Sequence, residues 1–515
     1  MTPDARDAPL LRLGVGHVLV LGVAGALGVA YASAYGVAVG AGVIAAVSVM
    51  LWTAVRPRTA LLVIIGSAAP LSGLRRGFPV PFLRLGEALI LGGALVTLLL
   101  VDRYQGAKWR SVEYFLTGYV VLTIVVGYWS MRRTGVAVTA ENVGLLIVPA
   151  FHALAYFTAK GFGRHPDAVR QGLRLTLLGS IPITALGILQ YVRAPFVGSF
   201  LKTFGDPTIF DQNVTAGYVA RATGTFNHWH LLAGYLFVVV VLAVSLLLED
   251  GQNVMTRRAL VAVVAINAVG LLLTLTYTAF IGVIGATILI GFSTGRGLKV
   301  LGHMALAAVV LAVVFWGALA GRAADQFSVG TTLGSSALVP QTVQYRLQVW
   351  QDQFLPSIES QPVLGYGPQL PASLRWKYTE SLYVTLLLRG GLVLLLAFAA
   401  LWLSLIRRAF GQARVRGPND RALGRTVGTC ALLLIPMQAL FPYFTSPGLP
   451  HLLMILAGLS FAGPVTPRHR SQPRVVSRPD RTGPVPAGPV QTGPVHTGSA
   501  GSSSSTRSSQ AYARS

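Results

Sequence analysis

Charge and cysteine are scarce in this chain. Only 11% of its 515 residues are charged, 53% are hydrophobic, and Cys430 is its one cysteine. A disulfide or a thiolate metal site within one chain needs at least two cysteines, so both are excluded. The mean hydropathy is +0.62, and long apolar runs recur, which together indicate an integral membrane protein.

Several signature motifs are also missing. The sequence has no GxxxxGK[ST] loop for nucleoside triphosphates, no GxSxG nucleophile turn and no HExxH zinc motif. His228 and His230 are two residues apart, so they point in different directions on a helix, and no carboxylate follows to complete a metal site. We therefore expect neither a metal nor a cofactor.

Acidic residues are fewer than basic ones. The chain has 41 Lys and Arg against 17 Asp and Glu, for a net charge of +24. In a soluble domain this excess would suggest nucleic acid. Here the basic residues gather in short loops and in the C-terminal tail, as the positive-inside rule describes for the cytoplasmic side of membrane proteins. We therefore expect no nucleic-acid partner.

Apolar runs of about 20 residues are long enough to cross a hydrocarbon core of roughly 30 Å. Because lipid offers no partner for exposed backbone groups, these runs must be helices. The sequence thus predicts an all-α polytopic membrane protein, with about 12–14 transmembrane helices within residues 1–463. The expected spans are about 13–30, 35–54, 85–101, 111–130, 141–160, 172–191, 229–248, 258–276, 278–293, 299–320, 380–406, 425–444 and 449–463.

The loops and the tail predict an orientation. With the N-terminus in the cytoplasm, the basic loops fall inside and two long polar loops, about 192–228 and 321–379, fall outside. Residues 464–515 are rich in Arg, Pro, Gly and Ser and cannot bury enough apolar surface to fold. We expect a disordered basic tail in the cytoplasm, so that both termini lie on that side.

The first polar cluster, Arg221–His230, has the sequence RATGTFNHWH and precedes an expected span. Arg221 is a permanent cation whose planar guanidinium suits phosphate oxygens. Gly224 permits close approach of the backbone. The alternative is an arginine at the membrane interface beside an aromatic anchor, which needs no ligand.

A second polar stretch, Gln344–Leu392, interrupts the apolar sequence. Its first part, to Ile358, is typical of a short amphipathic helix with further helical turns in the large outer loop, and Pro362–Pro368 predicts a turn-rich break. Three aromatic side chains can stack on sugar rings, or pack and anchor at the interface instead: Trp350, Tyr366 and Trp376.

Carboxylates occur at the ends of several expected spans. Glu380 lies at the start of one, where it can act as a general base or simply as an acid favoured by the helix N-terminus. Glu87 and Glu113 also lie at span ends, and we expect them to snorkel to the interface. Few charges fall at mid-span, which counts against an ion-coupled transporter.

Three segments together resemble the O-antigen ligase and polymerase family of bacterial membrane glycosyltransferases. RATGTFNHWHLLAGYL is similar to its RxxGtfn segment, and YRLQVWQDQFLPSIESQPVLGYGP is similar to its RxxxW…PxxGxG segment. ESLYVTLLLRGGL is similar to the following (H/E)(N/S)xyl…G segment. The order and spacing of these segments and the large outer loop agree with the family over about residues 60–460.

The resemblance implies a cell-envelope glycosyltransferase in residues 1–463. It would act on the outer face of the cytoplasmic membrane, with a glycan on undecaprenyl diphosphate as donor and no metal or nucleotide. By position, Arg221 and Arg346 would bind the carrier diphosphate, and Glu380 would replace a histidine that activates the acceptor hydroxyl. Substrate-binding residues in these motifs would be Gly224, Asn227, His228, Trp350, Gly365, Tyr366, Gly367, Trp376 and Tyr383. Partners would be the lipid-linked glycan, the bilayer, and other polysaccharide export and chain-length proteins.

The chain departs from the family pattern in two places. Many members have Ser-Arg near the turn Thr274–Thr278, where this chain has no arginine, so one phosphate contact is missing or comes from Lys202 or Arg375. Glu380 and Ser381 replace the His-Asn of typical ligases. This favours a repeat-unit polymerase of exopolysaccharide biosynthesis over a ligase that passes finished glycan to a lipid, protein or wall acceptor. A polysaccharide or lipid transporter is the alternative of another class.

Overall fold

The computed structural model describes eleven stretches of the chain and the isolated residues Gly488 and Gly493. The stretches are 57–75, 83–99, 109–163, 166–204, 221–249, 254–317, 320–321, 341–371, 374–375, 378–414 and 417–462. The chain divides into two units, Met1–Val465 and Thr466–Ser515. The expected spans 13–30 and 35–54, and nearly all of the tail, lie outside the described residues.

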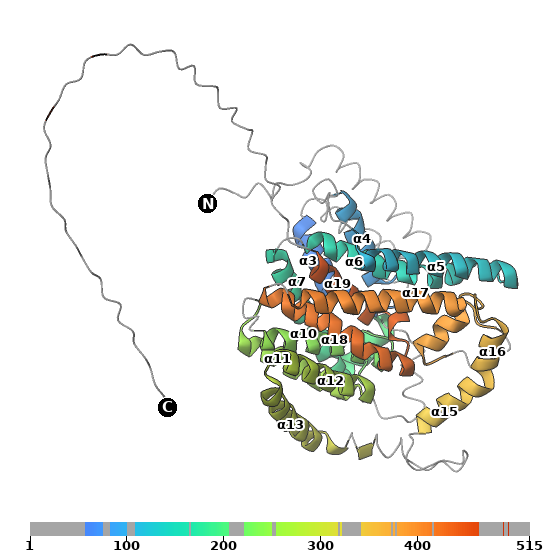
Figure 1. The fold of residues 1–515 in the computed structure, drawn as a ribbon. Coiled ribbons are helices and arrows are strands. Elements are labelled where there is room, and N and C mark those ends of the chain that lie inside the picture. The colour runs from blue at the N-terminus through green and yellow to red at the C-terminus, as the bar shows by residue number, and fades with distance from the viewer. Residues whose placement is uncertain are drawn as a thin grey trace, which may run out of the picture. The chain divides into compact units, whose positions relative to one another are not determined.

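The described part of the chain is helical and contains no strand (Figure 1). Its apolar helices are α3 (Pro57–Leu71), α4 (Leu85–Leu99), α5 (Ser111–Thr134), α6 (Ala140–Phe162), α7 (Pro166–Tyr191), α10 (Trp229–Leu248), α11 (Arg257–Leu273), α12 (Tyr277–Ser293), α13 (Gly297–Val314), α17 (Leu382–Gln412), α18 (Pro418–Leu440) and α19 (Leu449–Phe461). Among the described helices, α5, α6, α7, α10, α17 and α18 are long and apolar enough to cross a membrane. The all-α polytopic fold is therefore confirmed.

Helix α10 lies at the centre of the bundle. Its sequence is apolar on every face, and all its residues from Leu231 to Ala243 are buried. A helix of this kind has to be covered on all sides, and α7, α11, α12, α18 and α19 pack around it. By contrast, Val121, Val125 and Trp129 of α5 are exposed and lie on one face at a spacing of four residues, as a lipid-facing stripe does.

The first part of the polar stretch Gln344–Leu392 forms a small cluster against the start of α17. The expected amphipathic helix consists of α15 (Gln341–Val349), a π-helical turn η3 (Trp350–Phe354) and α16 (Leu355–Ser360). Its apolar side chains pack on the beginning of α17 around Phe354 and Leu388. Figure 1 shows α15 and α16 at the end of the bundle where α17 begins, which we call the loop end. The other long loop, 192–228, contains a further short helix, α8 (Pro195–Phe204).

Two expected features are wrong. Glu87 and Glu113 do not snorkel to the interface, because both side chains are buried. Glu113 accepts hydrogen bonds from Lys160 at 2.6 Å, from Arg408 at 2.7 and 2.9 Å, and from Tyr156. Lys160 lies in the last turn of α6. A buried carboxylate persists only when it is paired, and here α6 and α17 supply the cations.

Candidate functional site

The segment that begins with Arg221 is held by backbone hydrogen bonds. The side-chain oxygen of Gln190 in α7 accepts from the backbone N–H groups of Thr223 at 2.8 Å and Gly224 at 3.1 Å. The N–H of Ala222 donates to the carbonyl of Leu273 at 3.0 Å. Gly224 has a φ of 57°, in the left-handed region that favours glycine. The segment is therefore a fixed support for Arg221 at the start of α10.

Arg221 lies over an aromatic ring and next to a neutral histidine. Its guanidinium carbon is 4.5 Å from the centre of the Trp229 ring, within cation–π distance. Burial, and then the charge of Arg221, lower the pKa of His228 to about 4, so this imidazole is neutral near pH 7. Its Nδ1 accepts from the N–H of His230 at 3.2 Å. The side-chain oxygen of Asn227 is buried and has no hydrogen-bond partner among the described residues.

A short aromatic segment between α18 and α19, Phe441–Thr445, joins the two polar stretches. The ring of Phe441 lies 5.5 Å from His228 and 4.5 Å from His230, centre to centre. Tyr443 is buried, and its hydroxyl is 3.3 Å from that of Thr278. Burial raises the pKa of Tyr443 to about 12, although the Thr278 hydrogen bond and the charge of Arg346 lower it.

Phe444 and Thr445 line one cavity with Thr385 and Arg389 of the second polar stretch, so the two polar stretches meet across Phe441–Thr445. Sequence reasoning did not assign this segment a role. Its composition could have indicated one, because FPYFT places three aromatic residues between two apolar runs.

Arg346 and Glu380 form an ion pair at the loop end. Arg346 Nε donates to a carboxylate oxygen of Glu380, although the residues are 34 apart in sequence. The side chains are 19% and 33% exposed, so the pair remains accessible. They line a small cavity of about 10 Å³ together with Tyr345, Val349, Trp350, Phe354, Tyr378 and Thr379. The structure thus brings together two of the three residues expected to be catalytic.

Glu380 has an unusual backbone. Its φ is 49°, in the left-handed region that residues other than glycine seldom adopt. Such a conformation costs of order 1–3 kcal/mol and concentrates at functional sites, where the surroundings enforce it. Glu380 lies two residues before α17, which begins at Leu382 and has Ser381 as its N-cap. The Glu380 carboxylate pairs with Arg346 of α15.

The aromatic residues expected at the site have structural partners. Trp350 Nε1 donates to the carbonyl of Thr379 at 3.3 Å, and the Tyr366 hydroxyl donates to the backbone carbonyl of Ser357 at 3.0 Å. The Tyr383 hydroxyl donates to the carbonyl of Ile435 in α18 at 2.6 Å. These contacts fix the rings in place, and their role in sugar binding stays a prediction. Trp376 lies outside the described residues.

The glycine-rich turn Pro362–Pro368 packs on a kink in α17. Gly391 interrupts that helix with φ 59° and ψ −156°. The N–H groups of Tyr366 and Gly367 donate to the carbonyls of Leu388 and Arg389 at 2.7 and 3.0 Å. A Cβ on Gly365 or Gly391 would overlap the opposite backbone. Both glycines are therefore required by close backbone contact.

Helix α5 holds the same turn from the other side. Ser130 Oγ donates to the carbonyl of Leu364 at 3.0 Å. The Arg133 guanidinium donates to the side chain of Gln361 at 2.6 Å and to the carbonyl of Gly365 at 3.1 Å. The turn is thus clamped between α5 and α17, which fixes the loop end to the membrane helices.

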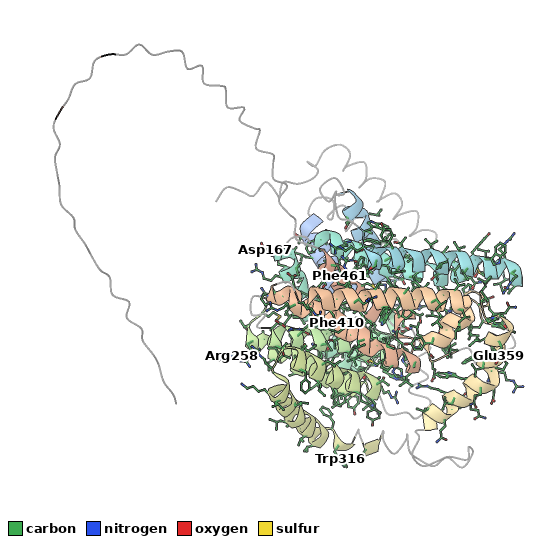
Figure 2. The ribbon with its side chains drawn as sticks, viewed as in Figure 1. Asp167, Arg258, Trp316, Glu359, Phe410 and Phe461 are labelled. Atoms are coloured by element: carbon green, nitrogen blue, oxygen red, sulfur yellow. The ribbon has the colours of Figure 1, made fainter. Side chains whose placement is uncertain are left out.

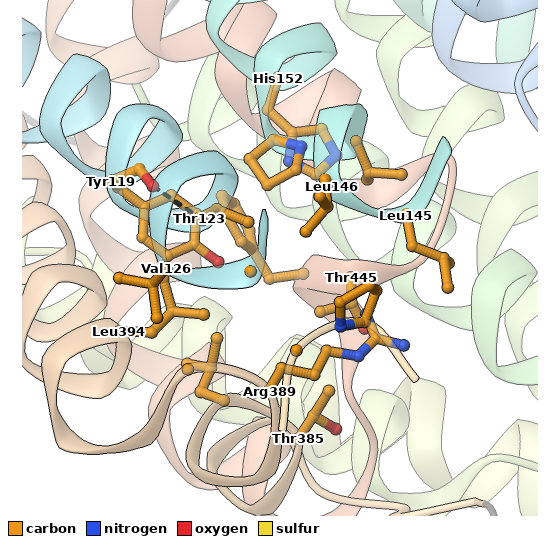
Figure 3. Close-up of a pocket in the computed structure, with 18 residues that line it drawn as sticks. Tyr119, Thr123, Val126, Leu145, Leu146, His152, Thr385, Arg389, Leu394 and Thr445 are labelled. Carbon is orange, nitrogen blue, oxygen red and sulfur yellow. Dashed lines mark hydrogen bonds between the residues drawn. The ribbon is translucent and has the colours of Figure 1, made fainter. Parts of the chain in front are cut away.

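Arg389 is a residue that the sequence analysis missed. It lines a cavity of about 100 Å³ between α5, α6, the start of α17 and the segment Phe441–Thr445. Figure 3 shows Arg389 beside Thr445 on one side of this cavity and His152 on the opposite side. Its Nε is buried and has no hydrogen-bond partner among the described residues. The available signal was a lone arginine in the apolar run LYVTLLLRGGL.

The cavity adjoins the Arg346–Glu380 pair. Thr385 lines it, and the Thr385 hydroxyl is hydrogen-bonded to that of Thr379, the neighbour of Glu380. Of the other cations expected near the site, Arg375 is exposed and is not among the described residues that line the cavity. The side chain of Lys202 lies outside the described residues.

Comparison with known families gives one match. A family model described as O-antigen ligase matches residues 260–399. The matched region runs from α11 into α17 and contains Arg346, Glu380 and Arg389, whereas the Arg221 segment lies before it. Among curated proteins, none matches the chain.

Proposed function

The chain belongs to the O-antigen ligase and polymerase family of membrane glycosyltransferases, and we propose that it transfers a glycan from an undecaprenyl-diphosphate carrier to an acceptor hydroxyl. The observation that carries this proposal is the ion pair between Arg346 and Glu380. The pair supplies a fixed cation and a carboxylate in one accessible place, inside the region that matches the family. No metal or nucleotide is needed for this chemistry.

In the unliganded protein, Arg346 holds the Glu380 carboxylate. When the donor binds, its diphosphate oxygens compete for the guanidinium, because two phosphate oxygens suit the planar fork of an arginine. Arg346 and Arg221 then face the diphosphate, on which negative charge develops as it leaves. Fixed cations are most effective where charge develops in the transition state.

The released carboxylate of Glu380 becomes the general base. The acceptor oxygen attacks the anomeric carbon from the face opposite the diphosphate and gives its proton to Glu380. The bond between that carbon and the phosphate oxygen breaks, and its electron pair stays on the departing undecaprenyl diphosphate. One displacement at the anomeric carbon inverts its configuration.

The identity of the acceptor distinguishes two candidate activities. Glu380 and Ser381 stand where typical ligases carry His-Asn, and this favours a polymerase whose acceptor is another carrier-linked repeat of a surface polysaccharide. A second candidate is a ligase that transfers finished glycan to a lipid, protein or wall acceptor, and the family description, O-antigen ligase, favours it. In both cases the basic short loops support an active site on the outer face of the cytoplasmic membrane.

The test uses Arg346→Ala and Glu380→Gln in cells that lack the native copy. We expect both variants to be present at wild-type amounts and to give no full-length polymer. Arg258→Ala is the matched control, because Arg258 is exposed and lies at the end of the bundle away from Glu359 of α16 (Figure 2). Full-length polymer in both variants would contradict the proposal.

The cells without the native copy also separate the two candidates. A polymerase joins repeats on the carrier, so its loss leaves single repeats linked to undecaprenyl diphosphate. A ligase acts after polymerisation, so its loss leaves long glycans on the same carrier. Separation of the carrier-linked glycans by length distinguishes these outcomes.

A further inference from the structure

A polar cavity lies where α10 and α12 end and α18 begins. Its volume is about 310 Å³, and its described lining includes three arginines and contains none of the residues assigned to glycan transfer. The lining residues are Leu248, Glu249, Ser293, Thr294, Arg296, Arg421 and Arg425. Helix α17 starts at the loop end and finishes shortly before α18 begins, so the cavity lies at the opposite end of the bundle (Figure 1).

One buried carboxylate pairs with two of the arginines. Arg421 Nε donates to a carboxylate oxygen of Glu249 at 2.9 Å, and Arg425 pairs with the other oxygen. Glu249 is the one acid among the described residues that line the cavity. Its single negative charge is therefore too small to balance the arginines of the lining.

The ends of two helices offset part of the remaining positive charge. Arg296 donates to the carbonyl of Leu248, the last residue of α10, at 2.7 Å. Arg425 donates to the carbonyl of Ser293, the last residue of α12, at 3.3 Å. A helix C-terminus carries roughly half a negative charge. With Glu249, the two helix ends offset about two of the three positive charges in the lining, so a surplus of about one remains.

The arginines are accessible as well as fixed. Arg296 is exposed, and Arg421 and Arg425 are partly exposed. A guanidinium offers its N–H donors in a planar fork that matches two oxygens of a phosphate group. Fixed, accessible guanidinium groups with a surplus of positive charge fit an anionic phosphate group.

An exposed apolar stripe on α12 leads to the cavity. Ile281, Leu289 and Phe292 are exposed, and their spacing of eight and three residues places them on one side of the helix. The stripe ends beside Ser293 and Thr294, which line the cavity. The polar cavity therefore borders a surface that faces lipid.

Helix α18, which packs against α12, repeats this arrangement. Leu432 and Ile435 are exposed and follow Arg425 by seven and ten residues, so they lie on the same side of α18 as that arginine. A phosphate group held by the arginines would have exposed apolar side chains of two helices beside it. Acyl chains attached to the phosphate would cover that apolar surface, whereas a free ion would not.

We propose that this cavity binds the headgroup of an anionic phospholipid of the cytoplasmic leaflet. The acyl chains would lie along the exposed apolar sides of α12 and α18. Basic pockets between membrane helices on the cytoplasmic side hold such headgroups in other proteins, and the basic loops at this end of the bundle support that side. The surplus of about one positive charge matches a single phosphodiester, which carries one negative charge. The site is separate from glycan transfer and forms no covalent bond.

The binding test uses the full-length protein, stripped of lipid in detergent and titrated with phosphatidylglycerol, with bound lipid measured by native mass spectrometry. We expect Arg425→Gln to weaken the affinity by about tenfold or more, because a charge-assisted contact is lost. Arg296→Gln should also weaken it, and this exposed position keeps the test available if Arg425→Gln does not fold. Arg258→Gln, an exposed position at the same end but outside the described lining, should bind as the wild type does (Figure 2). Wild-type affinity in the folded cavity variants would overturn the proposal.

Glu249→Gln gives a prediction of the opposite sign. The substitution removes the carboxylate and raises the surplus of positive charge in the cavity by one. Without lipid the variant should unfold at a lower temperature, because two arginines lose their partner. It should nevertheless bind phosphatidylglycerol more tightly than the wild type. Weaker binding than in the wild type would mean that the cluster only joins helix ends, and would overturn the proposal.

Two further probes identify the ligand. Phosphatidylcholine has no net charge and should bind to the wild type at least about tenfold more weakly than phosphatidylglycerol, because its ammonium group meets the same arginines. Equal affinity for the two lipids would contradict the argument from charge. Inorganic phosphate at the same concentration should not displace phosphatidylglycerol, and full displacement would overturn the assignment to a lipid.

Discussion

Glu380 allows function and stability to be separated by two substitutions at one position. Glu380→Gln keeps the shape of the side chain and removes the base. The Arg346–Glu380 pair is 19% and 33% exposed, and ion pairs in contact with water contribute about 1 kcal/mol or less. We therefore expect Glu380→Gln to reduce stability by at most about 1 kcal/mol, while transfer falls by a factor of about 10²–10⁴ with the loss of a general base.

Glu380→Gly should act on the backbone instead. The φ of 49° at Glu380 costs a non-glycine residue of order 1–3 kcal/mol, and glycine adopts it freely. Glycine also loses about 0.5–1 kcal/mol through the greater freedom of its unfolded chain. With the ion pair removed as well, the expected net change in the free energy of unfolding runs from about 1 kcal/mol of destabilisation to about 2.5 kcal/mol of stabilisation.

Thermal unfolding in detergent and polymer length in cells measure the two effects on the same variants. The reasoning predicts that Glu380→Gly is as stable as Glu380→Gln or more stable, and that neither supports polymer formation. An unfolding temperature of Glu380→Gly well below that of Glu380→Gln would refute the argument from backbone strain. Polymer of normal length in Glu380→Gln would refute the role of the carboxylate as a base.

Other positions give further predictions. Gly391→Ala should lower the free energy of unfolding by about 2 kcal/mol or more, because the new Cβ would overlap the backbone of Val363 and the φ is 59°. Gly411→Ala in the same helix is the control, because nothing lies within 4 Å of a Cβ there. It should raise the free energy of unfolding by up to about 1 kcal/mol, measured by thermal unfolding. Glu113→Gln should cost about 3–5 kcal/mol and lower the yield of folded protein, because it leaves two buried cations without their carboxylate. The pKa of His228 is about 4 in the folded protein and near 6.5 in the unfolded chain. The stability that the neutral imidazole contributes should therefore be fully present above about pH 6.5 and be lost progressively as the pH falls toward about 4. His228→Phe should remove this part of the pH dependence of unfolding.

Much of the helical fold could be predicted from local sequence. The span expected at 229–248 coincides with α10, and the polar turn expected at Thr274–Thr278 separates α11 from α12. Apolar run length and turn chemistry are local properties, so they are visible in one sequence. Boundaries were less accurate where charged residues extend a helix: α5 continues to Thr134, past Arg132 and Arg133, rather than ending near residue 130.

The site could be predicted only in part, because its contacts join distant residues. Arg346 and Glu380 were each singled out by residue type and position, but their ion pair depends on how α15 returns to the start of α17. Glu113 and Arg408 are 295 residues apart in sequence, and the periodicity of hydrophobic residues cannot predict that they pair. The place of Arg389 in a cavity lined by α5, α6 and α17 likewise becomes visible only in the structure.

The most direct measurement uses the purified protein in lipid vesicles, supplied with a repeat unit linked to undecaprenyl diphosphate as both donor and acceptor. The wild-type protein should form longer carrier-linked glycans and release undecaprenyl diphosphate, with inversion at the newly joined anomeric carbon. Arg346→Ala and Glu380→Gln should do neither, and Arg258→Ala should behave as the wild type. Chain growth at the wild-type rate in both site variants would contradict the claim that this pair carries the transfer reaction.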